Sequence, residues 1–156
     1  MIYLFYYKNN LGDILSYYII KKISGEDIRF TNPLSIKIVM HDLLSFGKLL
    51  IKRQWKTAAS RITFSFKPVI IGVGSLLEHS TSNCITWGTG MAQKHMIPSG
   101  GRFLITRGYL SKQVLENVGF KVESEICGDP ALLMPLLYKP NIEIMTDKIG
   151  VIPHIS

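Results

Sequence analysis

Val69-Ile70-Ile71-Gly72-Val73-Gly74-Ser75 is the stretch that decides the fold, because an apolar run without a polar face ends there in a glycine-containing turn. Such a run predicts a buried strand of a parallel sheet. The run Ile2 to Tyr7 has the same character and leads into Lys8-Asn9-Asn10-Leu11-Gly12. Phe103 to Thr106 likewise leads into Arg107-Gly108. The chain therefore repeats a unit of buried strand followed by turn.

Helical segments alternate with these strands. Further strands are predicted at Ile36 to Met40, Ile85 to Trp87 and Val122 to Ile126. Helices are predicted from Asp13 to a stop at Gly25, from His41 onward, from Leu110 to Val118, and from Ala131 to Leu137. The apolar side of the first helix is expected to comprise Ile14, Leu15, Tyr18, Ile19 and Ile23. The alternation indicates an α/β domain with a Rossmann-like, doubly wound, mainly parallel sheet.

Polar and glycine-rich turns follow the carboxyl ends of the predicted strands. They are Gly12-Asp13, Gly72 to Ser75, Gly88-Thr89-Gly90, Arg107-Gly108 and Gly128-Asp129. Ligands of doubly wound sheets bind outside this edge, so it is the predicted functional edge. The turn at Gly72 lacks both the third glycine of the dinucleotide fingerprint and the lysine of a P-loop.

Three charged residues in these turns have a structural as well as a functional interpretation. Asp13 and Asp129 are each in a position to cap a helix, and Pro130 suits the first helical position after Asp129. Arg107 follows a strand directly and is suited to bidentate pairing with a phosphate or a carboxylate. A surface ion pair is the alternative for Arg107.

Composition excludes several classes of protein. The 156 residues, 47% of them hydrophobic, are enough for one domain with a sizeable core. Cys84 and Cys127 do not make a disulfide framework, and the four histidines share no metal-ligand spacing, so we expect no metal. We expect the apolar run at the start to be a buried strand rather than a signal peptide, and no apolar stretch approaches the length needed to cross a bilayer. We expect a cytoplasmic protein, with peripheral contact to the inner face of the plasma membrane left open.

The net charge of +7 comes entirely from the first 68 residues. From Leu43 to Leu77 there is no acidic residue, and Lys48, Lys52 and Lys56 recur every four residues. This spacing predicts a basic amphipathic helix. The polar side of this helix has three possible roles: a face in contact with water only, a surface that binds anionic membrane, or a nucleic-acid contact. Nucleic acid is the least favoured, because no nucleic-acid-binding motif is present.

The order of the motifs is more specific than any one of them. They are Asn10-Leu11-Gly12-Asp13, Ile70 to Leu77, Trp87-Gly88-Thr89-Gly90, Arg107-Gly108 with Ser111 to Leu115 and Gly119, Gly128-Asp129-Pro130-Ala131-Leu132-Leu133, and Gly150-Val151-Ile152-Pro153-His154. In this order, from about Tyr3 to His154, the chain resembles the polysaccharide pyruvyl transferase family.

The resemblance implies a GT-B-like architecture of two Rossmann-like halves. Members transfer the pyruvyl group of phosphoenolpyruvate to two hydroxyls of one sugar in a surface polysaccharide, with release of phosphate. No cofactor is implied, and the sugar acceptor is expected to be free or lipid-linked. Arg107 would help to hold the donor, Asp13 would contact acceptor hydroxyls, and Asn10, Gly12, Gly74, Ser75 and Thr89 would complete the substrate-binding edge.

The resemblance covers only the family's N-terminal half. It divides the chain into a Rossmann-like domain (1–137), a linker (138–148) and the first strand of a second domain (149–156). The family's Arg-x-His element, with the expected acid/base histidine, belongs to the second half, and His154 does not take its place. We therefore expect this chain alone to be inactive.

Two other functions remain open at this point. One is the N-terminal half of a GT-B-type glycosyltransferase, whose donor would be a nucleotide sugar. The other is a non-enzymatic basic module that binds a membrane surface through the helix at Lys48 to Lys56.

Overall fold

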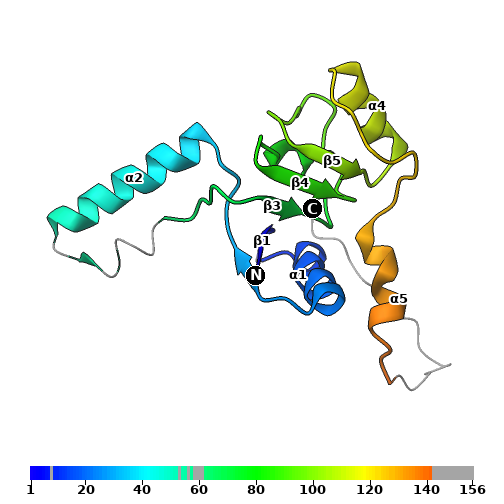
Figure 1. Cartoon of the computed structure of the whole chain (residues 1–156), viewed down its shortest axis with the longest axis horizontal. Coiled ribbons are helices and arrows are strands. Elements are labelled where there is room, and N and C mark those ends of the chain that lie inside the picture. The colour runs from blue at the N-terminus through cyan, green and yellow to red at the C-terminus, as the bar shows by residue number, and fades with distance from the viewer. Residues whose placement is uncertain (8, 53, 56, 58–61, 142–156) are drawn as a thin grey trace, which may run out of the picture.

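A parallel β-sheet forms the centre of the protein. The computed structural model describes residues 1–7, 9–52, 54–55, 57 and 62–141 (Figure 1). Within these residues five strands pair in the order β2-β1-β3-β4-β5, and all neighbours are parallel. The strands are β1 (Ile2–Phe5), β2 (Ile28–Phe30), β3 (Val69–Ile71), β4 (Cys84–Trp87) and β5 (Arg102–Ile105). The predicted α/β, Rossmann-like fold is confirmed.

The segments between and after the strands form helices, not all of which pack on the sheet. They are α1 (Leu11–Ser24), α2 (Ile36–Ile51), α4 (Tyr109–Asn117) and α5 (Met134–Leu137), with short 3-10 helices η1 (Leu77–His79) and η2 (Pro130–Leu133). Ile20 of α1 lies beside Ile70 and Ile85 on one face. Leu115 of α4 packs against Phe103, whose register neighbour is Thr86, on the opposite face. The chain therefore winds on both sides of the sheet.

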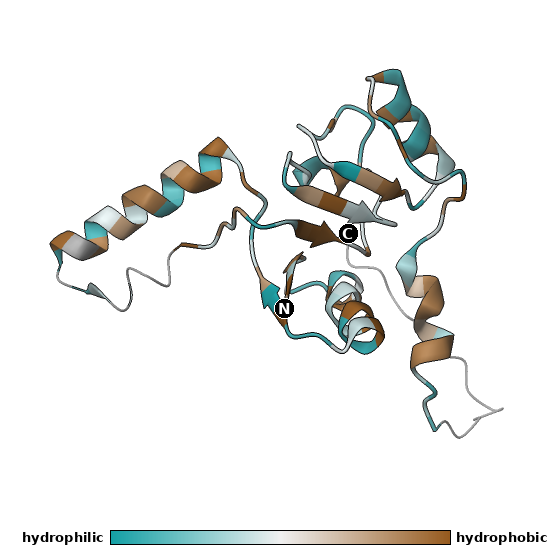
Figure 2. Cartoon of the chain, viewed as in Figure 1, coloured by the Kyte–Doolittle hydropathy of each residue, from teal (hydrophilic) through white to brown (hydrophobic). Residues whose placement is uncertain are grey.

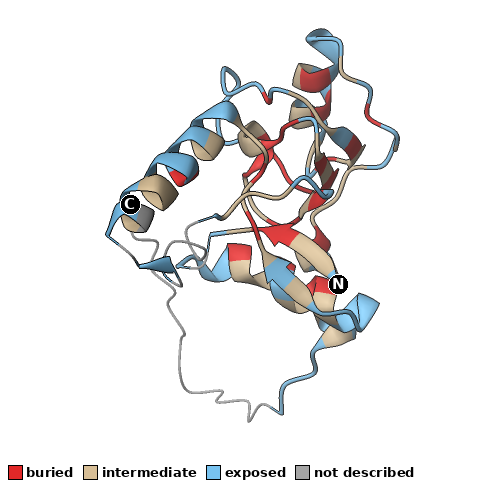
Figure 3. Cartoon of the chain, turned by 60° about the vertical axis from the view of Figure 1, so that its left-hand side comes forward, coloured by how far each residue is buried: buried red, intermediate tan, exposed pale blue. Residues whose placement is uncertain are grey.

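The buried residues concentrate in the strands and on the helix sides that face them (Figure 3). One cluster consists of Phe5, Val69, Ile71, Leu76 and Cys84, and a second consists of Leu77, Phe103, Leu115 and Val122. The strands that carry these residues are largely hydrophobic (Figure 2). This core holds the turns at the carboxyl ends of the strands in place.

The buried side of α1 differs from the prediction. Asp13, Ser16, Ile19 and Ile20 are buried, whereas Ile23 is 54% exposed. Ser16 faces the turn after β3, where its hydroxyl donates to Val73 O at 3.4 Å. The prediction was wrong because it assumed that only apolar residues face the sheet. In the structure Asp13 and Ser16 also point inward, toward the backbone of the turn after β3.

Two of the predicted signals at helix ends are confirmed. Helix α1 ends at Gly25 in the left-handed conformation (φ 67°), and Lys21 and Lys22 lie in its last turn. Asp129 caps η2, since its Oδ1 accepts from Ala131 N at 2.9 Å and Pro130 follows it. Both signals depend only on neighbouring residues, which is why the sequence alone revealed them.

Two predicted strands are wrong. Ile36 to Met40 forms the first part of α2, and the second strand of the chain is Ile28–Phe30 instead. Val122 to Ile126 makes only an isolated bridge, between Val122 and Phe103. The predicted strand at 149–156, the residue His154 and most of the predicted linker lie outside the described residues.

Candidate functional site

The strand order places two turns at the centre of the functional edge. From β1 the chain moves outward to β2, and it then returns to the other side of β1 as β3. The connections after β1 and β3 consequently leave the sheet in opposite directions, which is the arrangement at which doubly wound folds bind their ligands. The residues after β1 enter α1, and those after β3 form the turn Gly72 to Ser75.

Asn10, not Asp13, caps α1. Its backbone is extended, and its Oδ1 accepts from Gly12 N at 2.9 Å. The capping interpretation of Asp13 is therefore wrong. Asp13 lies inside the first turn of α1, where the residue is only 5% exposed.

Asp13 meets the turn after β3 at Gly74. Gly74 has a φ of 108°, and a Cβ built there would overlap Asp13 Oδ1. Only glycine can occupy this position without displacing the carboxylate. Asp13 has no hydrogen-bond partner among the described side chains, and burial raises the pKa of its carboxyl above the ordinary 3.8.

Thr89 links the turns after β3 and β4. Its hydroxyl is fully buried, donates to Gly74 O at 3.0 Å and accepts from Leu76 N at 3.1 Å. Gly90 N also donates to Gly74 O, at 3.0 Å. The structure thus gives Thr89 a positioning role within the edge, while the half-buried Ser75 beside Gly74 makes no hydrogen bond among the described residues.

Arg107 joins the same edge from the end of β5. Its backbone N donates to Thr89 O at 3.0 Å, and a Cβ built on Gly90 would lie 3.0 Å from Arg107 Nε. The side chain is exposed and takes part in none of the ion pairs between described residues. The alternative of a surface ion pair therefore finds no support in the described part of the chain.

The predicted residues thus form one chain of contacts along the edge. Asp13 meets Gly74, Gly74 is bonded to Thr89 and Gly90, and Gly90 lies against Arg107. Gly128 and Pro130 contact the position of Gly88, which brings the fifth turn to the same edge. The carboxylate at one end and the guanidinium at the other give the edge two chemically different parts.

A cavity of about 580 Å³ beside this edge contains titratable residues that the sequence did not single out. The hydroxyl of Tyr7, just after β1, lies 2.8 Å from His79 Nε2 of η1. Glu78 and Lys37 also line the cavity. Partial burial, followed by the charges of Glu78 and Asp13, raises the pKa of the Tyr7 hydroxyl above its usual value.

The Tyr7 and His79 pair can carry a proton, and Glu78 has one buried carboxylate oxygen without a hydrogen-bond partner. Glu78-His79 follows a predicted strand and its turn closely, and this position is the only sequence signal for the pair. Tyr7 lies 72 residues away, so its pairing depends on the tertiary structure. Within the described residues, no three His, Cys, Asp or Glu side chains form a group able to hold a metal ion.

No protein-family model, curated protein or solved structure matches the chain. The resemblance to the polysaccharide pyruvyl transferases stays a prediction.

Proposed function

We propose that this chain is the substrate-binding N-terminal half of a two-domain, GT-B-like enzyme that transfers pyruvyl from phosphoenolpyruvate to a sugar. The observation that carries the proposal is the presence, on one edge of the sheet, of a largely buried carboxylate and an exposed guanidinium that both lack a protein partner among the described residues. Asp13 supplies the first and Arg107 the second. A carboxylate binds hydroxyl donors and a guanidinium binds anions, so the two side chains together favour a site for two substrates.

Asp13 is suited to sugar hydroxyls. Burial deprives the Asp13 carboxylate of part of its hydration, and hydroxyl donors of a ligand would replace that hydration. An anionic ligand at this point would meet a like charge, and Asn10 already occupies the amide of Gly12. The N-terminus of α1 is thus unlike the phosphate sites of nucleotide-binding folds. This argues for a sugar acceptor and against a nucleotide pyrophosphate at this part of the edge.

Arg107 is suited to the donor. Phosphoenolpyruvate carries a carboxylate and a phosphate, both of which match the planar fork of a guanidinium. The small size of Gly90 lets the side chain lie close over the turn. Arg107 would therefore hold the donor from the β5 end of the edge while Asp13 holds the acceptor near α1.

The reaction needs positioning and proton transfer. One sugar hydroxyl adds to C2 of the donor while its methylene carbon gains a proton. The second hydroxyl then attacks C2, loses its proton and displaces phosphate, which completes the cyclic ketal. Tyr7 and His79 offer a proton carrier beside the edge.

Calorimetric titration of phosphoenolpyruvate into the protein tests the proposal. We expect weak saturable binding that Arg107→Ala abolishes. Arg102→Ala is the matched control, because Arg102 lies in β5, which Arg107 follows, and is paired with Glu123 at 2.6 Å. Unchanged binding by Arg107→Ala, equal loss in both variants, or a preference for a nucleotide sugar would overturn the proposal.

A further inference from the structure

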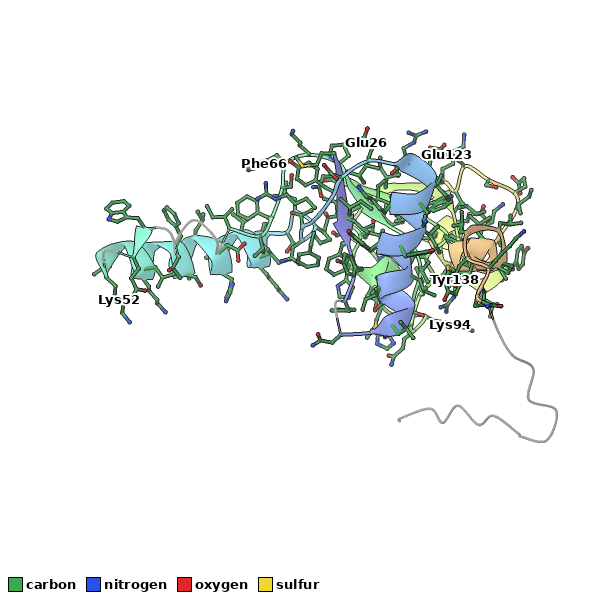
Figure 4. All side chains as sticks on the ribbon, turned by 90° about the horizontal axis from the view of Figure 1, so that it is seen from below. Glu26, Lys52, Phe66, Lys94, Glu123 and Tyr138 are labelled. Carbon is green, nitrogen blue, oxygen red and sulfur yellow. The ribbon has the colours of Figure 1, made fainter. Side chains whose placement is uncertain are left out.

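Helix α2 projects away from the sheet (Figure 1). Viewed from below, it extends sideways from the body, and Lys52 lies near its outer end (Figure 4). Residues 62–66 return beside it, where Thr63 donates from its N and Oγ1 to Asp42 at 2.7 and 2.9 Å. One side of the helix is attached to this segment, and the opposite side faces outward.

The outward side is apolar. Ile36 is 80% exposed, Met40 58%, Leu43 52%, Leu44 62% and Ile51 85%. These positions follow helical spacing and form one continuous stripe. Trp55, shortly beyond the helix, is 67% exposed. A row of large apolar side chains on a projecting helix indicates a binding surface.

The charge beside this stripe is of one sign. Lys37 and Lys48 are exposed on α2, and Lys52 follows directly after it, at helical spacing next to the apolar stripe. Asp42, the acidic residue of α2, is 4% exposed and bonded to Thr63. The carboxylate of α2 is therefore buried, and the charged side chains exposed beside the apolar stripe are lysines.

We propose that α2 docks in the plane of an anionic lipid surface. The stripe would enter the boundary between headgroups and acyl chains, and the lysines would meet lipid phosphates. No helix in the described part of the chain is long and apolar enough to span a bilayer, so this contact is interfacial. The proposal is independent of the proposed enzymatic function.

Charge argues against the other occupants. A second copy would bring two rows of lysine together across the apolar stripe, where like charges repel. A nucleic acid would neutralise the lysines and leave Ile36, Leu44 and Ile51 exposed to water. An anionic membrane satisfies both parts of the surface.

Co-sedimentation with vesicles of phosphatidylcholine alone and of phosphatidylcholine with phosphatidylglycerol tests this docking. We expect binding to the anionic vesicles only, weakened by added salt. Lys48→Glu with Lys52→Glu should reduce the affinity about thirtyfold or more. The matched control, Lys94→Glu with Lys121→Glu, makes the same charge change at exposed sites away from α2 and should bind more tightly than the α2 variant.

The apolar stripe has its own variant. Leu44→Glu should abolish vesicle binding, whereas Ile126→Glu, at a residue 74% exposed elsewhere, should not. Both sites are exposed, so the fold tolerates either change. Equal binding to neutral and anionic vesicles, retained binding by Leu44→Glu, or equal loss in the control variants would overturn the proposal. If the protein did not bind vesicles but bound duplex DNA, the proposal would also be overturned. The same holds if it did not bind vesicles but self-associated through a contact that Leu44→Glu abolishes.

Discussion

Asp13 is a residue whose burial opposes stability. Its carboxylate lies against Gly74 without a hydrogen-bond partner among the described residues. A chain selected for stability alone would place an apolar side chain or a paired group there. The residue is consistent with a ligand that supplies the missing donor.

The raised pKa of Asp13 has a consequence for stability. The folded protein favours the protonated carboxyl, so this contribution is present at low pH and is lost as pH rises above about 4 through the folded pKa. We expect Asp13→Asn, which removes the ionisation, to become more stable relative to wild type as pH increases from 3 to 7. Urea unfolding at several pH values measures this difference.

Asp27→Asn is the control of opposite sign. The hydrogen bond and charge of Lys21 lower the pKa of Asp27, so this carboxylate stabilises the fold above its unfolded pKa, and the benefit is lost as pH falls. The variant should therefore lose stability relative to wild type as pH rises. A flat pH dependence for Asp13→Asn would contradict the burial argument.

At the scale of the element, the sequence revealed what neighbouring residues determine. The strand, turn and helix from Ile2 to Gly25 depend on an apolar run, a cap and a terminal glycine, all of which are local. Arg107 was predictable in the same way, from its place directly after a strand. Its proximity to Gly90 is a tertiary contact and was not.

The error at Ile36 to Met40 has a physical cause. Its β-branched residues resemble a strand, but the helix places Ile36 in the outward apolar stripe and leaves Ile38 and Val39 half-buried. The true edge strand, Ile28–Phe30, is only three residues long with Arg29 at its centre, which is too short for a clear periodic signal. The apolar run and the strand propensity therefore gave the wrong secondary structure at Ile36 to Met40, because α2 packs little against the sheet and its apolar residues do not mark a buried strand.

Gly88 couples β4 to the turn before η2. Its φ is 80°, and a Cβ there would lie 2.7 Å from Gly128 O and overlap Pro130. Gly88→Ala should lower the free energy of unfolding by about 2–5 kcal/mol, from backbone strain and overpacking together. Thermal unfolding followed by circular dichroism measures the loss.

Gly25→Ala separates the two effects. Gly25 has a φ of 67° but no atom within contact of a Cβ, so only the backbone cost, about 1 kcal/mol, is expected. Equal losses in the two alanine variants would contradict the close approach of Pro130 to β4.

Asp42 attaches α2 to the segment at Thr63. Burial alone would raise the pKa of Asp42, but hydrogen bonds from Thr63 and His41 outweigh it and lower the pKa below 3.8. The attachment is therefore stable at neutral pH and is lost as pH falls through the folded pKa. Asp42→Ala should remove it at every pH, at a cost of about 1–3 kcal/mol, because Thr63 N loses its partner.

Hydrogen exchange of the α2 amides measures this effect. We expect faster exchange across α2 in Asp42→Ala and unchanged exchange in α4. Protection of α2 equal to wild type would show that other contacts hold the helix.

At the scale of the whole molecule, two surfaces divide the chemistry. The carboxyl edge of the sheet carries Asp13 and Arg107, and the projecting α2 carries the lysines with the apolar stripe. The sequence indicated both, from turns after strands and from a basic run without acids. It could not reveal that Tyr7 meets His79, because that contact exists only once β1 and β3 pair.

The edge as a donor site is the central claim, and amide chemical-shift mapping during titration with phosphoenolpyruvate tests it most directly. We expect saturable shifts at Gly74, Ser75, Gly90 and Arg107, absent in Arg107→Ala and retained in Arg102→Ala. Shifts confined to Lys48 and Lys52 that do not saturate, or no shifts at the edge, would contradict it.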